Sequence, residues 1–250
     1  MEVKYYLFDP TGNITLLVET PIEEKYQPEV ARKLMEIEPT AEQVGFVDGD
    51  SLRMAGGEFC GNASMSAAVL YCMKNGISAG ETRTVSLNVS GADEKVNVII
   101  NAESDGFTGT VEMPRYEAIE DRQLEFEGKT YTLPVVKFKG ISHIISENVL
   151  DRITAENAVK KWCADLNESC LGIMLYDSEK QSLEPLVYVS TAGTLFWERS
   201  CASGTSALGA YLLEKSGEAV ELSVSEPGGV LSVYADENGI KLSGKVKILK

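Results

Sequence analysis

The amino-acid sequence predicts an α+β protein of two similar halves, each a curled, mainly antiparallel sheet around a central helix. Two observations support this. Residues 85–113 align with residues 220–248 without a gap at a shift of 135 positions, and seven of the 29 aligned residues are identical. Two apolar helical segments, each preceded by a cysteine, repeat at a shift of 141. Self-similarity of this kind indicates an internal repeat.

The aligned segments alternate apolar and polar residues with period two, as strands with one buried face do. Turn residues such as Pro227-Gly228-Gly229 and Asn238-Gly239 separate the strands. Earlier segments correspond at a shift of 127 to 130: a strand, tight turn and strand, then an amphipathic helix, then a short buried strand. In that order, these pairs are 4–19 with 134–147, 28–37 with 155–166, and 44–48 with 172–177.

A polar, irregular segment at residues 114–130 separates the two copies. We therefore expect an N-terminal half at residues 1–120, carrying Cys60, and a C-terminal half at residues 121–250, carrying Cys201.

Composition excludes several classes of protein. The net charge of −15 argues against an extended nucleic-acid-binding surface, which needs Lys and Arg. No basic and apolar leader and no apolar run of membrane-spanning length is present. Five cysteines and one histidine give neither a disulfide framework nor a zinc motif. We expect a cytoplasmic protein with reduced thiols and no metal or organic cofactor, which binds neither nucleic acid nor membrane.

The two cysteine-led helices have the same signals at both ends. Cys60 follows a glycine-rich run, and the two helices end at Lys74-Asn75-Gly76 and Lys215-Ser216-Gly217. A basic residue in the last turn followed by glycine is typical of a helix end. Both helices are apolar on every side, which indicates that they are buried. Each sheet is therefore expected to wrap around its cysteine-led helix.

A thiol at a helix N-terminus suits acid–base chemistry. The first N–H groups of a helix lack intrahelical partners and carry the positive end of the helix dipole, so they stabilise a thiolate and bind carboxylates. The pKa of such a cysteine is expected to fall toward neutrality. Small residues after each cysteine, Gly61-Asn62-Ala63 and Ala202-Ser203-Gly204, allow a ligand to approach the backbone.

Two such helix ends facing one another would hold one carboxylate, with a thiol on either side of the adjacent carbon. One thiolate would remove the α-proton and the other thiol would return a proton to the opposite face, which inverts the centre without a cofactor. Thiols close enough to share one carbon are also expected to form a disulfide under mild oxidation.

Other cysteines fit a simpler explanation. Cys72, Cys163 and Cys170 have neither a glycine-rich lead-in nor a repeat partner, so we interpret them as small buried hydrophobic residues. The lone His143 is equally compatible with a structural role and a role in the site. A cysteine nucleophile with His143 as its base remains an alternative, although it leaves the second cysteine without a function.

The motifs resemble those of a known superfamily. The segment EFCGNA around Cys60 resembles the first catalytic motif of diaminopimelate epimerases. The segment ERSCASGTSA around Cys201 resembles the second motif of proline racemases and those epimerases. The resemblance covers essentially the whole chain. It implies the diaminopimelate epimerase-like fold and racemisation or epimerisation of amino acids without pyridoxal phosphate, by one cysteine from each half.

The resemblance also implies roles for individual residues. Cys60 and Cys201 become the two acid–base thiols. The main-chain N–H groups of Gly61-Asn62 and Ala202-Ser203 would hold the substrate carboxylate. Asn13, Glu198 and Arg199 complete the set that the resemblance implies, the last two orienting the ammonium group or the side chain. We add His143 as a candidate substrate-binding residue on our own interpretation of the sequence.

Three departures from the epimerases bear on the substrate. The loop before Cys60 is short, Arg199 precedes Cys201 by only two residues, and Ile141-Ser142 stands where the epimerases carry an asparagine. Recognition of a distal carboxylate is therefore not expected, and a histidine racemase of this superfamily is one candidate. The alternatives left open are a proton-shifting isomerase related to phenazine biosynthesis and a non-catalytic carboxylate-binding protein. The expected partner is a small amino acid, and a homodimer is one open oligomeric state.

Overall fold

The computed structural model describes residues 3–190 and 193–250. Contacts divide the chain into two compact units, the first Met1–Met113 with Lys241–Lys250 and the second Pro114–Ile240. This division differs from the expected halves, 1–120 and 121–250, chiefly at the C-terminus. The reason is strand pairing: Phe8 and Pro10 of the first strand pair antiparallel with Ile248 and Val246 of the last strand.

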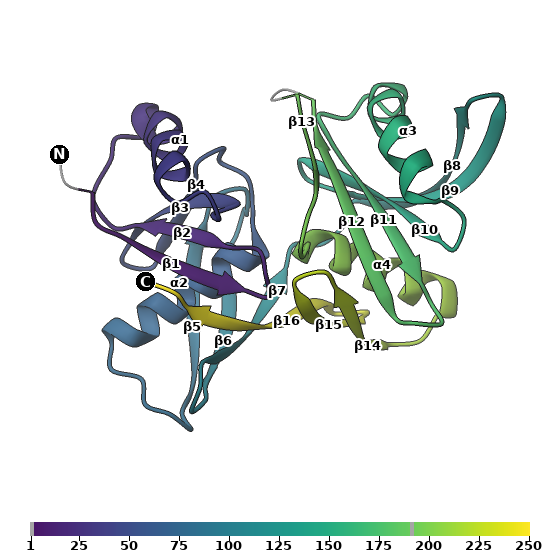
Figure 1. Ribbon diagram of the computed structural model, residues 1–250. Helices are drawn as coiled ribbons and strands as arrows, with labels where there is room; N and C mark the ends of the chain where they lie inside the picture. The colour runs from purple at the N-terminus through teal and green to yellow at the C-terminus, as the bar shows by residue number, and fades with distance from the viewer. Residues whose placement is uncertain (1–2, 191–192) are drawn as a thin grey trace. The chain divides into compact units, whose positions relative to one another are not determined.

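The first unit is a sheet that closes on itself. Its strands follow the order β1-β2-β3-β4-β5-β6-β7-β16, and β16 also pairs with β1 (Figure 1). Among the described residues, each of these strands therefore has a paired neighbour on both sides. The elements of the first unit are β1 (Tyr5–Pro10), β2 (Thr15–Val18), α1 (Gln27–Ile37), β3 (Gln43–Asp48), β4 (Ser51–Met54), α2 (Gly61–Lys74), β5 (Thr82–Val89), β6 (Val96–Ala102), β7 (Phe107–Met113) and most of β16 (Gly239–Ile248).

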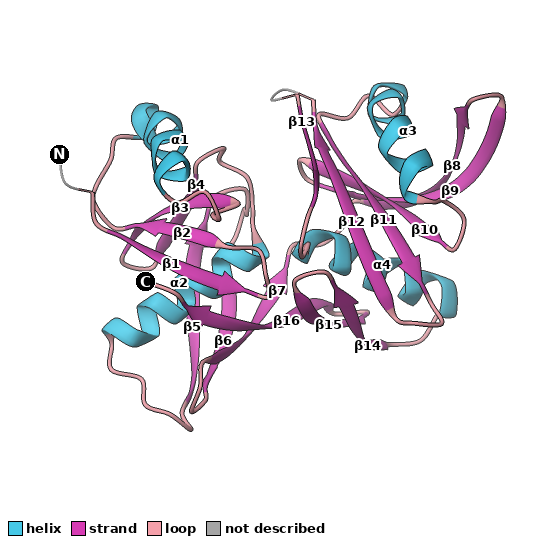
Figure 2. Ribbon diagram, viewed as in Figure 1, coloured by secondary structure: helices cyan, strands magenta, loops and turns pink. Residues whose placement is uncertain are grey.

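The second unit contains strands in the order β15-β14-β12-β11-β10-β9-β8, with β13 paired to β12. Figure 2 shows the same mixture of helices and strands in this unit as in the first. Its elements are β8 (Ala118–Phe126), β9 (Lys129–Phe138), β10 (Ile141–Glu147), α3 (Arg152–Asp165), β11 (Cys170–Asp177), β12 (Ser182–Val189), β13 (Thr194–Trp197), α4 (Ala202–Ser216), β14 (Val220–Glu226) and β15 (Gly229–Asp236).

The strand directions repeat between the units. Both sheets are mainly antiparallel, and each has parallel pairs at matching places: β2–β3 and β4–β5 in the first, β10–β11 and β12–β14 in the second. A parallel pair needs a crossover connection, and α1 and α3 supply it for β2–β3 and β10–β11. This pattern confirms the predicted α+β class with two pseudo-symmetric halves.

The cysteine-led helices occupy the central position in their units. Helix α2 contacts β1, β2, β5, β6 and β7, and helix α4 contacts β9, β10, β11, β14 and β15. All residues of α2 from Gly61 to Leu70 are buried, as are all those of α4 from Gly204 to Ala210. The expectation that all-round apolar helices are buried is confirmed, because each faces strands on several sides.

One expectation about the boundary segment is wrong. Residues 118–126 form β8, which pairs with β9 through a tight turn at Glu127-Gly128, both with positive φ (49° and 76°). The segment appears irregular in sequence because β8 ends its sheet and exposes residues 120–123 on both faces. A largely solvated edge strand does not need the alternation of apolar residues that identifies a half-buried one.

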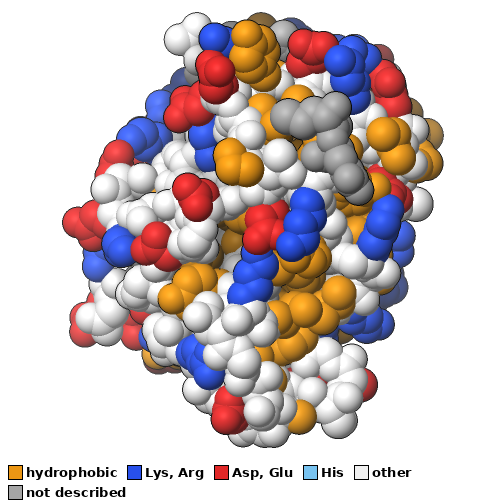
Figure 3. All heavy atoms as spheres, turned by 90° about the vertical axis from the view of Figure 1, so that its left-hand side faces the viewer, with side chains coloured by type: hydrophobic (Ala, Val, Ile, Leu, Met, Phe, Trp, Pro, Cys, Tyr) orange, Lys and Arg blue, Asp and Glu red, His pale blue; other side chains and the backbone are white. Residues whose placement is uncertain are grey.

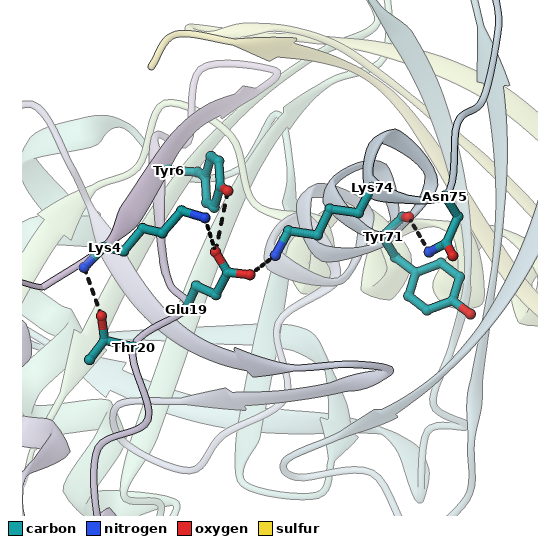
Figure 4. Close-up of polar contacts among 7 residues, drawn as sticks. All are labelled: Lys4, Tyr6, Glu19, Thr20, Tyr71, Lys74 and Asn75. Carbon is teal, nitrogen blue, oxygen red and sulfur yellow. Dashed lines mark hydrogen bonds and ion pairs between the residues drawn. The ribbon is translucent and has the colours of Figure 1, made fainter.

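The far end of α2 is held by a group of polar side chains. Glu19 accepts from Lys74 at that helix end and also pairs with Lys4, at 2.8 Å (Figure 4). Tyr6 donates to the same carboxylate at 3.3 Å, and the side-chain amide of Asn75 donates to the Tyr71 carbonyl at 2.8 Å. These contacts fix the position of the helix end opposite Cys60.

Charges of both signs are interspersed over the face drawn in Figure 3, with no large region of one sign. In the part of the chain that the structure describes, no helix is long and apolar enough to cross a membrane.

Candidate active site

Cys60 lies where α2 begins. Its backbone is extended (φ −138°, ψ 115°), and its Sγ accepts the main-chain N–H of Ala63 at 3.4 Å. The carbonyl of Cys60 accepts the N–H and the hydroxyl of Ser64, at 2.9 and 2.7 Å. The cysteine is therefore the N-cap residue of α2, a position usually occupied by Ser, Thr, Asp or Asn.

Cys201 occupies the same position in the second unit. It is extended (φ −129°, ψ 101°), its Sγ accepts the N–H of Gly204 at 3.4 Å, and its carbonyl accepts the N–H of Thr205 at 2.9 Å. A Cβ at residue 204 would lie 2.1 Å from Met174 Sδ and 3.2 Å from Cys201 Sγ, so a larger residue there would displace the buried Met174 side chain beside the thiol. The prediction that each cysteine starts a helix is confirmed.

The residues after each thiol form the first helical turn. Gly61-Asn62 and Ala202-Ser203 open α2 and α4, and all but the half-buried Ser203 are buried. Their main-chain N–H groups belong to the set that has no intrahelical partner. Each unit therefore presents helix N–H groups beside a thiol, an arrangement that suits a carboxylate ligand.

Gln43 connects two residues of the predicted site. The Cys60 thiol donates to Gln43 Oε1 at 3.0 Å, and Gln43 Nε2 donates to Asn13 Oδ1 at 2.5 Å and to Thr15 Oγ1 at 2.7 Å. Asn13 is only 6% exposed and donates from Nδ2 to Glu42 Oε2 at 3.0 Å. Asn13 and Cys60, 47 positions apart in the sequence, are thus two hydrogen bonds apart.

Sequence reasoning missed Gln43. The parallel register of β2 and β3 sets it opposite Thr15. In the sequence, Gln43 is only a polar residue at the start of a buried strand, and this feature alone does not identify a neighbour of the Cys60 thiol.

His143 is fully buried on β10, beside α4. Its Nε2 lies 3.0 Å from the Ser203 hydroxyl, and that hydroxyl lies 3.6 Å from Cys201 Sγ. Burial lowers the pKa of His143 from 6.5 to about 3, so the imidazole is neutral at physiological pH. A base this weak, which reaches the thiol only through Ser203, does not suit the cysteine–histidine nucleophile alternative.

Glycine at position 172 makes room for the His143 ring. A Cβ there would lie 2.2 Å from His143 Nδ1. Nδ1 is buried and makes no hydrogen bond to the residues that the structure describes. The ring is therefore held by packing and by its Nε2 contact with Ser203.

Glu198 and Arg199 differ in their relation to Cys201. Glu198 is half-buried, and its side chain contacts the Cys201 thiol. Arg199 is exposed, and its main-chain carbonyl accepts the N–H of Gly228 at 2.7 Å. Of this pair, the structure brings Glu198 and not the Arg199 side chain to the thiol.

A second carboxyl group, not anticipated from the sequence, lies at the start of α4. Glu226, the last residue of β14, accepts the Cys201 main-chain N–H on Oε2 at 2.7 Å and the Thr205 hydroxyl on Oε1. It is 7% exposed, and burial raises the pKa of its carboxyl to about 8. A buried acidic residue at the end of an alternating strand gave no sign of this role.

The expectation that a helix N-terminus lowers the thiol pKa is wrong for Cys201. Burial raises the pKa of this thiol well above its ordinary value, and the nearby Glu198 and Glu226 carboxyls raise it further. The Ser203 hydroxyl acts in the opposite direction but is the weaker influence. Desolvation disfavours the charged form, and it is the largest influence on this thiol.

Comparison with known proteins places this geometry in a family. Residues 2–249 match the model of the histidine racemase CntK N-terminal domain. A histidine racemase from Fusobacterium nucleatum subsp. nucleatum is 34% identical over 255 residues, covering 96% of this chain and 92% of that protein. A histidine racemase from Staphylococcus aureus is 28% identical over 251 residues, covering 92% and 88% of the two chains.

Solved structures support the fold. A hydroxyproline epimerase from Agrobacterium vitis superposes with a TM-score of 0.70 at 12% identity, covering 99% of this chain and 91% of that one. A probable proline racemase from Agrobacterium radiobacter gives a TM-score of 0.71 at 11% identity, with the same coverage. The predicted resemblance to the superfamily of racemases that work without pyridoxal phosphate is confirmed. The chain belongs to the family of the histidine racemase CntK N-terminal domain and is an amino-acid racemase, an isomerase.

Proposed function

We propose that this chain racemises histidine by two-base proton transfer between Cys60 and Cys201. The observation that carries the proposal is that both cysteines are N-cap residues of central, buried helices, one in each repeat. The names of the relatives from Fusobacterium nucleatum and Staphylococcus aureus support histidine as the substrate.

One cysteine, as thiolate, removes the α-proton: the C–H bond breaks, an S–H bond forms, and the electron pair stays on the α-carbon. The other cysteine, as thiol, delivers its proton to the opposite face and becomes the thiolate. The enzyme then carries its proton on the other sulfur and returns to its first state by exchange with solvent or by catalysing the reverse reaction.

The N–H groups of Gly61-Asn62 and Ala202-Ser203 would bind the substrate carboxylate and stabilise the charge that develops beside it. Preorganised donors of this kind commonly provide the largest part of transition-state stabilisation. Asn13, Glu198 and Arg199 are proposed to orient the ammonium group or the imidazole, and His143 to hold Ser203. No cofactor takes part in the proposed step.

The test is proton NMR of L-histidine with reduced enzyme in D2O, with a pool of other L-amino acids that includes diaminopimelate run alongside. We expect the histidine α-proton signal to disappear and D-histidine to form. Cys60→Ser and Cys201→Ser should each lower this rate by at least about 100-fold, because each removes one acid–base group. Cys170→Ser, a thiol outside the proposed site, is the matched control and should retain activity.

The outcomes separate the two parts of the proposal. Exchange of a different amino acid would refute histidine as the substrate and leave the two-thiol mechanism intact. Racemisation that survives in either Cys60→Ser or Cys201→Ser would refute the two-thiol mechanism.

Location and assembly complete the proposal. A mechanism that needs free thiols suits the cytoplasm, where thiols stay reduced. Fractionation of the native host tests this location, and we expect the protein in the cytoplasmic fraction. The oligomeric state, for which a homodimer is the proposed form, is tested by measuring the molar mass with light scattering at assay concentration.

A further inference from the structure

The carboxyl group of Glu226 closes the beginning of helix α4. One oxygen accepts the main-chain N–H of Cys201 at 2.7 Å, and the other accepts the hydroxyl of Thr205, one turn into the helix. Thr205 is fully buried and Glu226 is 7% exposed, so both contacts are shielded from solvent. The carboxyl therefore fixes the main chain of the residue that carries the thiol.

The first unit lacks this group. At the shift of 135 positions that aligns the strands, Glu226 corresponds to Gly91. Gly91 has a positive φ of 76°, and a Cβ there would lie 2.3 Å from the main-chain nitrogen of Phe59. The backbone that leads into Cys60 fills this space, so no side chain can occupy it. The two units therefore differ at this aligned position: the second has the Glu226 carboxyl at the main chain of Cys201, and the first has Gly91.

The surroundings of Cys201 are acidic and largely buried. The titratable groups that face this thiol are Glu198 from the preceding segment, Glu226 from β14 and, through Ser203, His143 from β10. His143 is neutral and provides no compensating positive charge. Three acidic groups this close together, two of them buried, cannot all ionise at ordinary cost, because like charges repel strongly where the effective dielectric constant is low.

We infer that Glu226 is a positioning residue for Cys201: it holds the main chain of the thiol against α4, and its charge keeps that thiol protonated as the pH rises. The inference rests on the proposed two-thiol function and deepens it. It assigns a control of protonation to the second half-site through a carboxyl group whose aligned position in the first unit is Gly91.

Burial raises the pKa of both groups, and the carboxyl ionises first. The carboxyl of Glu226, with a pKa of about 8, is mostly protonated at neutral pH and loses its proton before the Cys201 thiol does. Once ionised, it opposes the formation of a second negative charge at Cys201. Glu226 therefore extends the pH range over which Cys201 can act as a proton donor toward the alkaline side.

Glu226→Gln is the sharpest test, because the amide has the same shape, still accepts the Cys201 N–H and still contacts Thr205. We expect the alkaline limb of kcat/KM against pH to move down by about one pH unit, the order expected when one nearby charge is removed. The acid limb should stay in place, because Glu226 is uncharged there in the wild-type enzyme.

A direct titration supplements the kinetics. Thiolate absorbance in the ultraviolet is measured against pH, and Cys201 is isolated by subtracting the trace of the matching Cys201→Ser protein. Its ionisation should move to lower pH in Glu226→Gln. Glu221→Gln, the same substitution at an exposed position of β14, is the control and should leave both measurements unchanged.

A second variant, Thr205→Val, tests the same inference if Glu226→Gln does not fold. Thr205→Val removes the hydroxyl that stabilises the Glu226 carboxylate, so Glu226 stays neutral to higher pH and Cys201 should again ionise at lower pH, by a smaller shift. Coincident Cys201 titrations in wild type and in the folded variants would overturn the inference. Activity that persists in Cys201→Ser would instead refute the proposed function, and the titration would remain interpretable.

Discussion

The thiol of Cys60 donates a hydrogen bond of 3.0 Å to the side-chain oxygen of Gln43. The same amide donates to Asn13 and Thr15, so Gln43 connects the start of α2 to the turn between β1 and β2. Three separate segments of the first unit therefore depend on one side chain for their relative positions around the thiol.

Replacement of Gln43 by Glu is expected to shift the acid limb of kcat/KM to higher pH, because a carboxylate beside Cys60 disfavours its thiolate. Gln43→Leu, which removes all three hydrogen bonds without adding charge, should lower kcat/KM by about tenfold. Gln123→Glu, the same change on the exposed strand β8, is the control for added charge. An unchanged acid limb in Gln43→Glu would contradict the proposed role of Cys60 as an acid–base group.

The buried His143 is expected to make the protein less stable in mild acid. Its pKa is about 3 in the folded protein and 6.5 in the reference state, so the unfolded chain binds a proton that the folded chain does not. Stability from this group is complete above about pH 6.5 and is lost as the pH falls, by about 2 kcal/mol at about pH 5.

Urea unfolding of wild type and His143→Gln across this range measures the effect. The variant lacks the titrating ring and should show a flatter dependence of the free energy of unfolding on pH. Parallel curves for the two proteins would mean that His143 does not titrate as its burial requires.

Gly172→Ala is expected to destabilise the protein by about 1–3 kcal/mol, the usual cost of overpacking a core. The added Cβ would lie 2.2 Å from Nδ1 of the fully buried His143 ring, so the ring would have to shift within the core. In a double-mutant cycle with His143→Ala, the double variant should lose less stability than the sum of the losses in the two single variants, because removal of the ring makes room for the methyl group. Additive costs, measured by denaturant unfolding, would argue against this contact.

Mild oxidation is expected to inactivate the enzyme reversibly. The proposed mechanism requires the two thiols on opposite faces of one carbon, close enough to be joined, and an oxidant would convert both to a disulfide. Peptide mass spectrometry should identify a Cys60–Cys201 crosslink, and a reductant should restore activity. Substrate present during oxidation should protect the thiols. If oxidant leaves activity intact and no such crosslink forms, the proposed arrangement of the two thiols is wrong.

Local patterns in the sequence were sufficient for the fold class and for the two helix starts. The period of two in residues 85–113 and 220–248, and the all-round apolar helices after Cys60 and Cys201, are short-range signals that survive folding unchanged. The edge strand β8 was missed because its exposed residues give no alternation. The pairing of β16 with β1 was missed because strand partners distant in sequence are not specified by local periodicity.

By itself, the sequence determined that two thiols begin two buried helices in a repeated fold, because helix caps and apolar periodicity are local properties of the chain. Only the tertiary structure decided what surrounds each thiol. Gln43 reaches Cys60 from β3. Glu226 reaches Cys201 from β14, and Glu198 approaches the same cysteine from the segment between β13 and α4. Desolvation and the charge of distant residues decide the protonation of a thiol, and both arise only when the strands close around the helix.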